Sequence, residues 1–372
     1  MFTKFNLKDY NFKLLFLVLI AEIFGIVVIN SASSSDTIKQ IFGAVLGLGI
    51  IIFLSVVNYN FICKFYIYIY IFNLVMLLSV LLFGVEVNNA KRWILIGGAN
   101  GIQFQPSEFA KIFMIIFIST ILAKYYEKKK INTIKCLMIF AVSAAGCLIL
   151  ILSEPDLSTT LCLSMVLVTI LFVSGLSYKL IGIVLIIAIP LSNRFLWYIQ
   201  RPGQKLLKDY QANRILQFVN PSKYGADYSQ QSNSIMAIGS GKLNGKGLNT
   251  STIAKVKDAN FISEQQTDFI FSVIGEELGF IGSVIIIAIL LLIVVQCIKI
   301  ARTAKDAQGM LIATGVGVLI AYQSFINISV ATGIIPNTGI PLPFISYGLS
   351  SLISISAGIG MLLNISMQRR HF

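Results

Sequence analysis

The chain has 372 residues, of which 56% are hydrophobic and only 12% charged, and its formal net charge is +13. Soluble domains carry about 25% charged residues, so this composition excludes a large water-soluble domain as the bulk of the chain. No basic domain lies outside the apolar runs, which excludes nucleic acid as an expected partner. The excess of Lys and Arg instead indicates membrane orientation, because short cytoplasmic loops collect positive charge.

Histidine and cysteine chemistry is largely excluded as well. The single histidine, His371, lies one residue from the C-terminus, so a Ser-His-Asp triad or a histidine-rich zinc site is not expected. Five cysteines lie in or beside apolar runs without CxxC spacing, which is typical of small core residues. They are Cys63, Cys136, Cys147, Cys162 and Cys297. No metal site is predicted from these residues, and any catalysis must use carboxylates, Lys, Arg or hydroxyl groups.

Ten apolar runs, several of them near the ~20 residues that a spanning helix needs, are expected to form transmembrane helices. They cover residues 12–30, 38–57, 61–83, 107–123, 136–152, 157–173, 178–198, 269–296, 309–332 and 347–366. The first run could be a signal peptide, but its length and Glu22 favour an uncleaved helix. The seventh contains Pro190, which is unfavourable inside a helix. We therefore predict an all-α integral membrane protein, in which residues 1–372 form one polytopic domain of about ten transmembrane helices.

The distribution of Lys and Arg predicts the orientation of these helices. With the N-terminus in the cytoplasm, the inner segments hold most of the basic residues, including the run at 124–135. An even number of helices then places both termini in the cytoplasm. The outer side receives the segment 84–106 and a long polar loop, 199–268, between helices 7 and 8. That loop is longer than a plain connector in a compact protein.

Two polar clusters lie at the predicted outer ends of helices in the first half of the chain. Arg92 precedes the stretch QPSEFAK, in which Glu108 and Lys111 are three residues apart and share one helix face. They form either a structural ion pair or the polar wall of a cavity that binds an anionic head group. The second cluster is SEPDLST, where Asp156 opens a helix. It either caps free backbone amides or takes part in function.

The third cluster is FISEQQTDFIFSVIGEELG, in which Asp268 lies where the polar loop becomes an apolar helix. The positive end of the helix dipole favours an ionised carboxylate and partial burial opposes it, so this side chain is suited to act as a general base. Glu276 and Glu277 lie about two turns deeper. A charge there is expensive, so both residues are expected to have cationic or hydrogen-bonding partners in the bundle.

The fourth cluster, 336–351, reads PNTGIPLPFISYGLSS and combines three prolines with a glycine. It predicts a rigid re-entrant turn, since irregular backbone at membrane depth survives only where it is buried in protein or lines a cavity. The Gly-rich stretch 239–247 is neither a dinucleotide-binding nor a Walker A sequence. It is either a tight turn or a turn whose amides and lysines contact phosphate.

These clusters, in this order, resemble the SEDS family (shape, elongation, division and sporulation) of peptidoglycan glycosyltransferases. The matching stretches are KRWILIGG…IQFQPSEFAK, SEPDLSTT, AIGSGKLNGKGL, FISEQQTDFIFSVIGEELGFIG and NTGIPLPFISYGLSS. The similarity extends over about residues 20–366. Three positions depart from the family pattern, namely Ser158 for a Gly, Gln266 where many members have His, and Leu349 for the second Gly of SYGG. None of them removes a carboxylate.

The resemblance implies ten transmembrane helices and the polymerisation of lipid II. It assigns the essential aspartate of the family to Asp268. The candidate substrate-binding residues are Arg92, Glu108, Lys111, Asp156, Arg214, Gln266, Glu276 and Ser346. The expected reaction inverts the anomeric centre of an undecaprenyl-diphosphate-linked donor. Arg214, Lys111, loop lysines or a divalent cation (Mg or Mn) would stabilise the leaving diphosphate.

The resemblance also implies partners and a location. The expected partners are lipid II, the undecaprenyl-diphosphate-linked glycan, membrane lipids and a class B penicillin-binding protein that acts as transpeptidase. The expected location is the bacterial cytoplasmic membrane. Two alternatives stay open: a flippase or transporter for lipid-linked precursors, since polar groups and a re-entrant segment also suit transport, and a non-catalytic scaffold for a transpeptidase.

Overall fold

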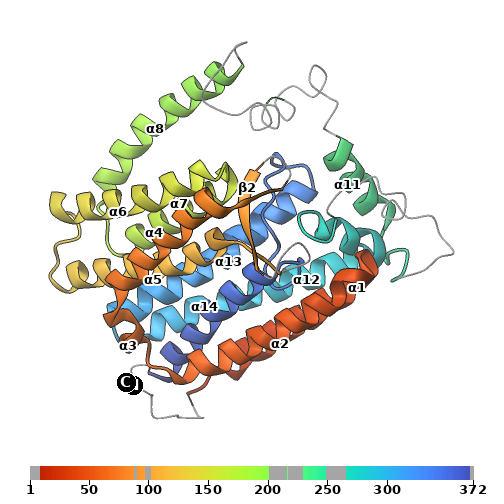
Figure 1. Cartoon of the computed structure of the whole chain (residues 1–372), viewed down its shortest axis with the longest axis horizontal. Helices are drawn as coiled ribbons and strands as arrows, with labels where there is room; N and C mark the ends of the chain where they lie inside the picture. Colours follow the sequence, from red (N-terminus) through yellow and green to blue (C-terminus); the bar gives the residue numbers. More distant parts are fainter. Residues whose placement is uncertain are drawn as a thin grey trace.

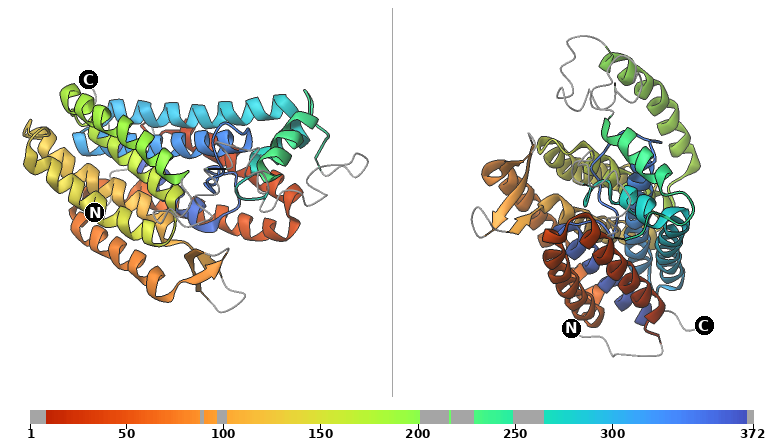
Figure 2. Two further views of the ribbon diagram at one scale, coloured as in Figure 1. Left: turned by 90° about the horizontal axis from the view of Figure 1, so that it is seen from above. Right: turned by 90° about the vertical axis from the view of Figure 1, so that its right-hand side faces the viewer.

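The computed structural model describes residues 9–87, 90–96, 102–200, 216, 229–248 and 265–368. Most of the predicted loop 199–268, including Arg214, lies outside the described residues, so its prediction as one extracytoplasmic loop stays untested. The described part is a bundle of helices that run side by side (Figures 1 and 2).

Each apolar run predicted from the sequence contains a helix. The helices are α1 (Phe12–Ala32), α2 (Ser34–Val56), α3 (Tyr59–Lys64), α4 (Tyr66–Phe83), α5 (Pro106–Glu127), α6 (Ile134–Ser153), α7 (Leu157–Val173), α8 (Tyr178–Ile199), α11 (Ser229–Ser240), α12 (Ile270–Thr303), α13 (Ala307–Ala331) and α14 (Leu349–Met367). The third run is divided into α3 and α4 at Phe65, and α12 continues to Thr303, beyond the predicted end at 296.

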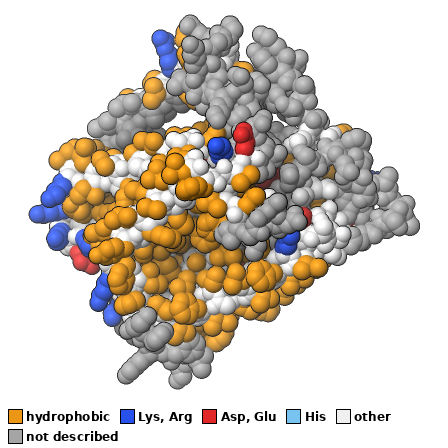
Figure 3. Space-filling model, viewed as in Figure 1, with side chains coloured by type: hydrophobic (Ala, Val, Ile, Leu, Met, Phe, Trp, Pro, Cys, Tyr) orange, Lys and Arg blue, Asp and Glu red, His pale blue; other side chains and the backbone are white. Residues whose placement is uncertain are grey.

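The bundle has the length and apolarity of a membrane domain. Among the described residues, eight helices are long and apolar enough to cross a bilayer, while α7 is a shorter apolar helix of 17 residues. In Figure 1, α8 diverges from the other helices. The all-α multi-pass membrane fold is confirmed, and the number of ten spans stays a prediction. Hydrophobic side chains cover much of the face drawn in Figure 3, and its Lys and Arg side chains gather mainly at one end.

The core of the bundle is formed by α5, α13 and α14. In its most apolar stretch, 89% of the residues of α5 are buried. Only 17% are buried in the corresponding stretch of α4, which therefore presents most of its side chains outward. A bilayer can solvate the outer helices, so a helix that is apolar all round lies either in the protein core or against lipid. The first run is a helix of this bundle: α1 buries Leu14, Val18 and Ile29, and the backbone at Gly25 packs against Phe344.

A small antiparallel sheet is the exception to the all-α prediction. Strands β1 (Val85–Val87), β2 (Ala90–Ile96) and β3 (Ile102–Phe104) pair in the order β1-β2-β3 within the predicted outer segment 84–106. Alternation over so few residues gives too weak a sequence signal to predict a strand. The sheet carries Arg92 toward the start of α7.

Candidate functional site

The four polar clusters found in the sequence meet at one end of the bundle. Hydrogen bonds join them: Gln105 N donates to Ser350 Oγ over 2.9 Å, and Ser158 Oγ donates to the carbonyl of Thr338. Ser346 Oγ donates to the carbonyl of Thr267 over 2.6 Å. The cluster 336–351, at the end of the re-entrant segment and the start of α14, is therefore the common partner of the other clusters.

Asp268 lies two residues before the first residue of α12 and is half-buried. Asn327 Nδ2 on α13 donates to the Asp268 carbonyl over 2.9 Å and to the Ile340 carbonyl over 2.8 Å. The side chain faces the re-entrant segment, because a Cβ placed on Gly339 would lie 3.3 Å from Asp268 Oδ2. Gly339 has φ +74°, a conformation that favours glycine. The Asp268 backbone is thus bound from α13, and its half-buried side chain lies beside the 336–348 segment.

Gln266 and Ser346 belong to the same junction. Tyr347 N donates to the Gln266 carbonyl over 2.9 Å. Ser346 is buried, and its Oγ also accepts from Leu342 N over 2.8 Å. The Ser346 hydroxyl is therefore used to hold the re-entrant turn against the start of α12. The substrate-binding roles predicted for Gln266 and Ser346 stay predictions.

Asp156 and Arg92 form the second part of the site. Asp156 caps α7, as one of the two interpretations predicts: its Oδ1 accepts from Thr159 N over 3.1 Å. Arg92 Nη1 lies 3.9 Å from Asp156 Oδ1, and the same guanidinium donates to the carbonyls of Glu154 and Pro155. Capping and ion pairing are therefore combined in one carboxylate, and the Arg92 side chain keeps 23% of its surface exposed.

Glu154 is a buried carboxyl that the sequence argument passed over. Its side chain is fully buried, and neither carboxyl oxygen has a hydrogen-bond partner among the described residues. Burial, the largest cause, and the charge of Asp156 together raise the pKa of Glu154 to about 9, although Arg92 acts in the opposite direction. A neutral carboxyl therefore stands directly behind the Arg92–Asp156 pair at neutral pH.

Glu108 and Lys111 form an ion pair inside the bundle. Lys111 Nζ lies 2.7 Å from Glu108 Oε1, and both side chains are nearly fully buried. Ser354 Oγ on α14 donates to the Glu108 carbonyl over 2.7 Å. Pro106 occupies the first turn of α5, as predicted. The two side chains therefore form the ion pair that one of the two interpretations predicts. Binding of a head group by Lys111 stays a prediction.

Glu276 and Glu277 have the partners that their depth requires. Glu276 Oε1 lies 2.7 Å from Lys246 Nζ, and Glu277 Oε1 accepts from Ser31 Oγ over 2.7 Å. The Gly-rich stretch is a tight turn that packs on α12, and one of its lysines neutralises Glu276. The structure therefore gives Glu276 a role inside the protein, and its predicted contact with substrate stays untested.

Sequence reasoning missed Asn327, which holds the backbone of Asp268. A signal was available, because Gln323, Ser324 and Asn327 interrupt an apolar helix, and polar groups at membrane depth usually face the bundle interior. All three are buried. Within the described ranges, no group of three or more His, Cys, Asp and Glu side chains is placed to hold a metal ion.

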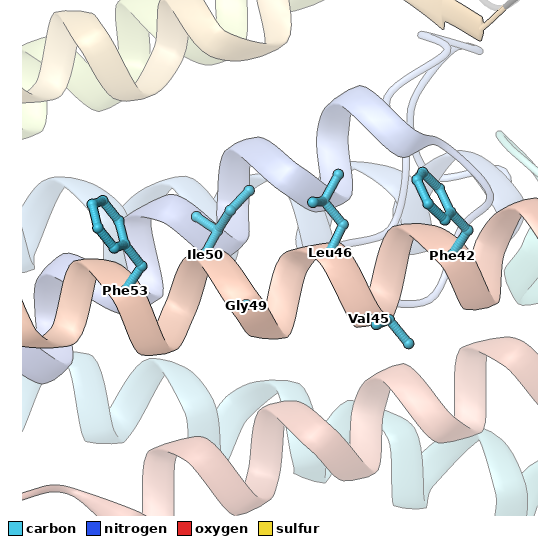
Figure 4. A pocket seen from close by; sticks show the side chains of 6 residues that line it. All are labelled: Phe42, Val45, Leu46, Gly49, Ile50 and Phe53. Carbon is cyan, nitrogen blue, oxygen red and sulfur yellow. The ribbon is translucent and has the colours of Figure 1, made fainter.

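A shallow apolar groove lies along α2 (Figure 4). It is lined by Phe42, Val45, Leu46, Gly49, Ile50 and Phe53. No atom lies within 4 Å of a Cβ placed on Gly49, so this position leaves open space between the larger side chains. The groove presents hydrocarbon to its surroundings and contains none of the predicted site residues.

The fold and the site define a multi-pass helical membrane protein with a carboxylate-bearing polar site at one end of its bundle. The family described as FTSW_RODA_SPOVE, cell cycle protein, matches residues 11–371. The chain therefore belongs to this family.

Curated relatives carry the same assignment. The chain is 35% identical over 315 residues to the probable peptidoglycan glycosyltransferase FtsW of Haemophilus influenzae, covering 83% of this chain and 75% of that protein. It is 34% identical over 310 residues to the peptidoglycan glycosyltransferase MrdB of Escherichia coli K12, covering 82% and 78%.

Solved structures share the fold. A chain from a study of the structural coordination of polymerization and crosslinking by a peptidoglycan synthase complex has a TM-score of 0.79 at 26% identity, with 96% of this chain and 97% of that chain covered. The rod shape determining protein RodA of Thermus thermophilus has a TM-score of 0.69 at 25% identity, with 98% of both chains covered. The bundle described above is therefore the fold of this family over nearly its full length.

Proposed function

We propose that this protein is a peptidoglycan glycosyltransferase that polymerises lipid II into glycan strands for cell elongation, division or sporulation. The observation that carries the proposal is the half-buried side chain of Asp268, which lies beside Gly339 of the re-entrant segment while the Asn327 amide on α13 binds the Asp268 backbone carbonyl. A fixed carboxylate at the rim of a polar site is the group that an inverting glycosyl transfer needs as its base.

In the proposed reaction, Asp268 removes the proton from the 4-hydroxyl of the acceptor GlcNAc. The oxygen attacks the anomeric carbon of the donor MurNAc, a glycosidic bond forms, and the bond to undecaprenyl diphosphate breaks. The anomeric centre inverts, and the proton stays on the carboxyl until solvent removes it. The diphosphate leaves with its own negative charge, so one base suffices if nearby cations stabilise that charge.

Candidate cations for the diphosphate differ in access. Arg92 is partly exposed, whereas Lys111 is buried beside Glu108. We infer that Arg92 can contact a substrate diphosphate in the described conformation, and that Lys111 needs a rearrangement of α5 or α14 to do so. Arg214 lies outside the described residues. A divalent cation (Mg or Mn) stays a prediction, and the described residues contain no group of three or more His, Cys, Asp and Glu side chains placed to hold it.

The lipid parts of the substrates need apolar surface next to the polar site. Polyprenyl chains would lie in grooves between or along the outer helices, and the groove over α2 is one such surface. Orientation follows the positive-inside distribution, with the site at the outer face of the cytoplasmic membrane and both termini in the cytoplasm. In support, the start of α1 and the end of α14 lie together, since Ser366 Oγ donates to the Asp9 carbonyl over 3.4 Å.

The proposed protein partner is a class B penicillin-binding protein that crosslinks the glycan. The fold similarity to a chain of a peptidoglycan synthase complex supports this partner. A scaffold role can coexist with catalysis, whereas a purely non-catalytic scaffold predicts that the carboxylates are dispensable. Transport of lipid-linked precursors is the rival function, and it requires a polar path between both faces of the membrane.

The deciding experiment uses purified protein in liposomes with fluorescent lipid II on both leaflets. An enzyme lengthens glycan, seen as a ladder on a gel, without moving lipid II between leaflets. A transporter changes the leaflet distribution, seen by dithionite quenching, without forming a ladder. Leaflet exchange with no glycan, alone or with a class B penicillin-binding protein present, would contradict the proposal.

A further inference from the structure

The long helix α12 is interrupted at Gly279, where φ is 64° and ψ is −160°. A helical residue donates its N–H to the carbonyl four positions earlier, so this break removes the bonds from Phe280 N to Glu276 O and from Ile281 N to Glu277 O. Four backbone groups are thereby left without helical partners, and inside a membrane bundle such groups are costly unless another segment binds them.

Residues 241–247 of the Gly-rich stretch, here called the clip, bind all four groups. Lys246 N donates to Glu276 O and Gly247 N to Glu277 O, each over 2.9 Å. In return, Phe280 N donates to the Lys242 carbonyl of the clip over 2.9 Å. Ile281 N donates to the Leu243 carbonyl over 3.2 Å. The clip therefore replaces the two hydrogen bonds that the helix lost.

Glycines permit this close approach. A Cβ on Gly241 would lie 2.0 Å from Gly275 O, and a Cβ on Gly245 would lie 2.1 Å from Glu277 O. A Cβ on Gly279 would lie 2.3 Å from Gly245 N. These separations are far below any contact that a side chain can make, so backbone meets backbone at three places along the clip.

A charge contact reinforces the backbone contact. Lys246 Nζ lies 2.7 Å from Glu276 Oε1, and both groups have little exposed surface. The adjoining helix α11 is hydrogen-bonded to the end of α13 and the residues that follow it. Gln231 Nε2 donates to the carbonyls of Val330 and Ile335, and Ser234 Oγ donates to the carbonyl of Ala331. The clip and α11 thus connect the first half of α12 to the end of α13, from which the re-entrant segment leaves.

We propose that the clip is a positioning element for Asp268, with Lys246 as a positioning residue that acts through Glu276. Asp268 directly precedes the half-helix 270–278, and its partner Gly339 follows the end of α13. The clip joins these two supports, so it sets the angle at which the carboxylate meets the re-entrant segment. The inference rests on the proposed role of Asp268 as base.

The test compares Lys246→Met, Lys246→Arg and Gly245→Ala with the parent protein. Lys299→Met is the matched control, because it removes an exposed lysine of the same helix α12 outside the clip. We expect Lys246→Met to lower kcat for lipid II by roughly tenfold at a nearly unchanged KM, and Gly245→Ala by on the order of 10²-fold, since small misplacements of a reacting group have effects of that size. Lys246→Arg should restore most of the activity.

Amide hydrogen exchange of residues 276–281 supplies the structural readout. It should become faster in Lys246→Met and Gly245→Ala and stay at the parental rate in Lys299→Met. Faster exchange at parental kcat would overturn the positioning role. A rise in KM alone would also overturn it, since Lys246 would then bind substrate. Should the single variants fail to fold, the double variant Lys246→Met with Glu276→Gln removes both charges of the pair. A parental kcat in that double variant would reject the positioning role of Lys246.

The outcomes for the two proposals are separable. If Asp268→Asn polymerises lipid II at the parental rate, the base assignment fails whatever the clip variants do. An inactive Asp268→Asn beside a fully active Gly245→Ala overturns the positioning role alone.

Discussion

The two ends of the bundle both carry polar networks, but they differ in how completely these are bonded. At the end opposite the site, Tyr59 Oη donates to Asp306 Oδ2 over 2.8 Å, and Asp306 Oδ1 accepts from Gly309 N over 2.7 Å. Asn364 accepts from Tyr59 N and donates to the Ser55 carbonyl. At the site end, both carboxyl oxygens of Glu154 and one of Glu108 have no hydrogen-bond partner among the described residues.

The difference separates two uses of polar residues in a membrane. Buried polar groups that serve the fold are normally fully bonded, so the network around Asp306 is a helix-capping device. Buried carboxyl oxygens without partners raise the free energy of the folded state, and they persist where chemistry or substrate binding requires them. Unbonded carboxyl oxygens and irregular backbone therefore distinguish the site end from the opposite end, while Glu22 Oε1 on α1 is a further buried carboxyl oxygen without a partner among the described residues.

The largest expected effect comes from removing the carboxylate at the site. Asp268→Asn should insert and fold like the parent and lose polymerisation of lipid II by about 10²–10⁴-fold, the range that a general base contributes. The matched control is Asp306→Asn, which keeps the cap and should polymerise at the parental rate. Glycan ladders from purified proteins at equal lipid II concentration give the comparison. Equal loss of activity in both variants would remove the distinction between the two ends.

The buried pair at the start of α5 should dominate stability at the site end. Lys111→Met leaves Glu108 charged and unpartnered, and we expect it to lower the free energy of unfolding by about 3–5 kcal/mol. Adding Glu108→Gln removes the stranded charge and should recover most of that loss. Thermal unfolding in detergent measures both.

Polymerisation then separates the two interpretations of the pair. If it only supports the fold, the stable double variant regains activity. If Lys111 binds diphosphate, the double variant stays impaired and needs a higher lipid II concentration. An unchanged concentration dependence would reject the binding role.

A smaller effect is expected at the opposite end. Tyr59→Phe removes one hydrogen bond to the Asp306 carboxylate, which is worth about 1.5–3 kcal/mol for a charged acceptor. The melting temperature should fall while kcat and KM for lipid II stay at parental values. A fall in kcat without loss of stability would show that this network also serves the reaction.

The stability of the site end should also depend on pH. Because burial raises the pKa of Glu154 from 4.5 to about 9, the folded protein holds a proton that the unfolded chain releases. Stability should therefore be greatest below about pH 4.5 and fall as the pH rises toward 9. Glu154→Gln cannot ionise, so its melting temperature should exceed that of the parent at pH 8 and match it near pH 5. Parallel pH profiles would show that Glu154 does not carry this dependence.

Local sequence patterns predicted much of the fold. Apolar runs located the helices, because burial in lipid or in the core depends on composition over about twenty residues. Asp156 as a cap and Pro106 in a first turn were predictable, because their hydrogen bonds and steric limits involve residues three or four positions away. The small sheet around Arg92 was missed because its strands are short.

The sequence by itself determined that this protein is a membrane bundle with four polar clusters, and it singled out Asp268. Only the tertiary structure decided which groups meet: Lys246 with Glu276, Ser31 with Glu277, and the clip with the break at Gly279. Such pairs join residues far apart in the chain, and their register depends on how whole helices pack. No local periodicity encodes that packing, so the support around the carboxylate became visible only once the helices were in place.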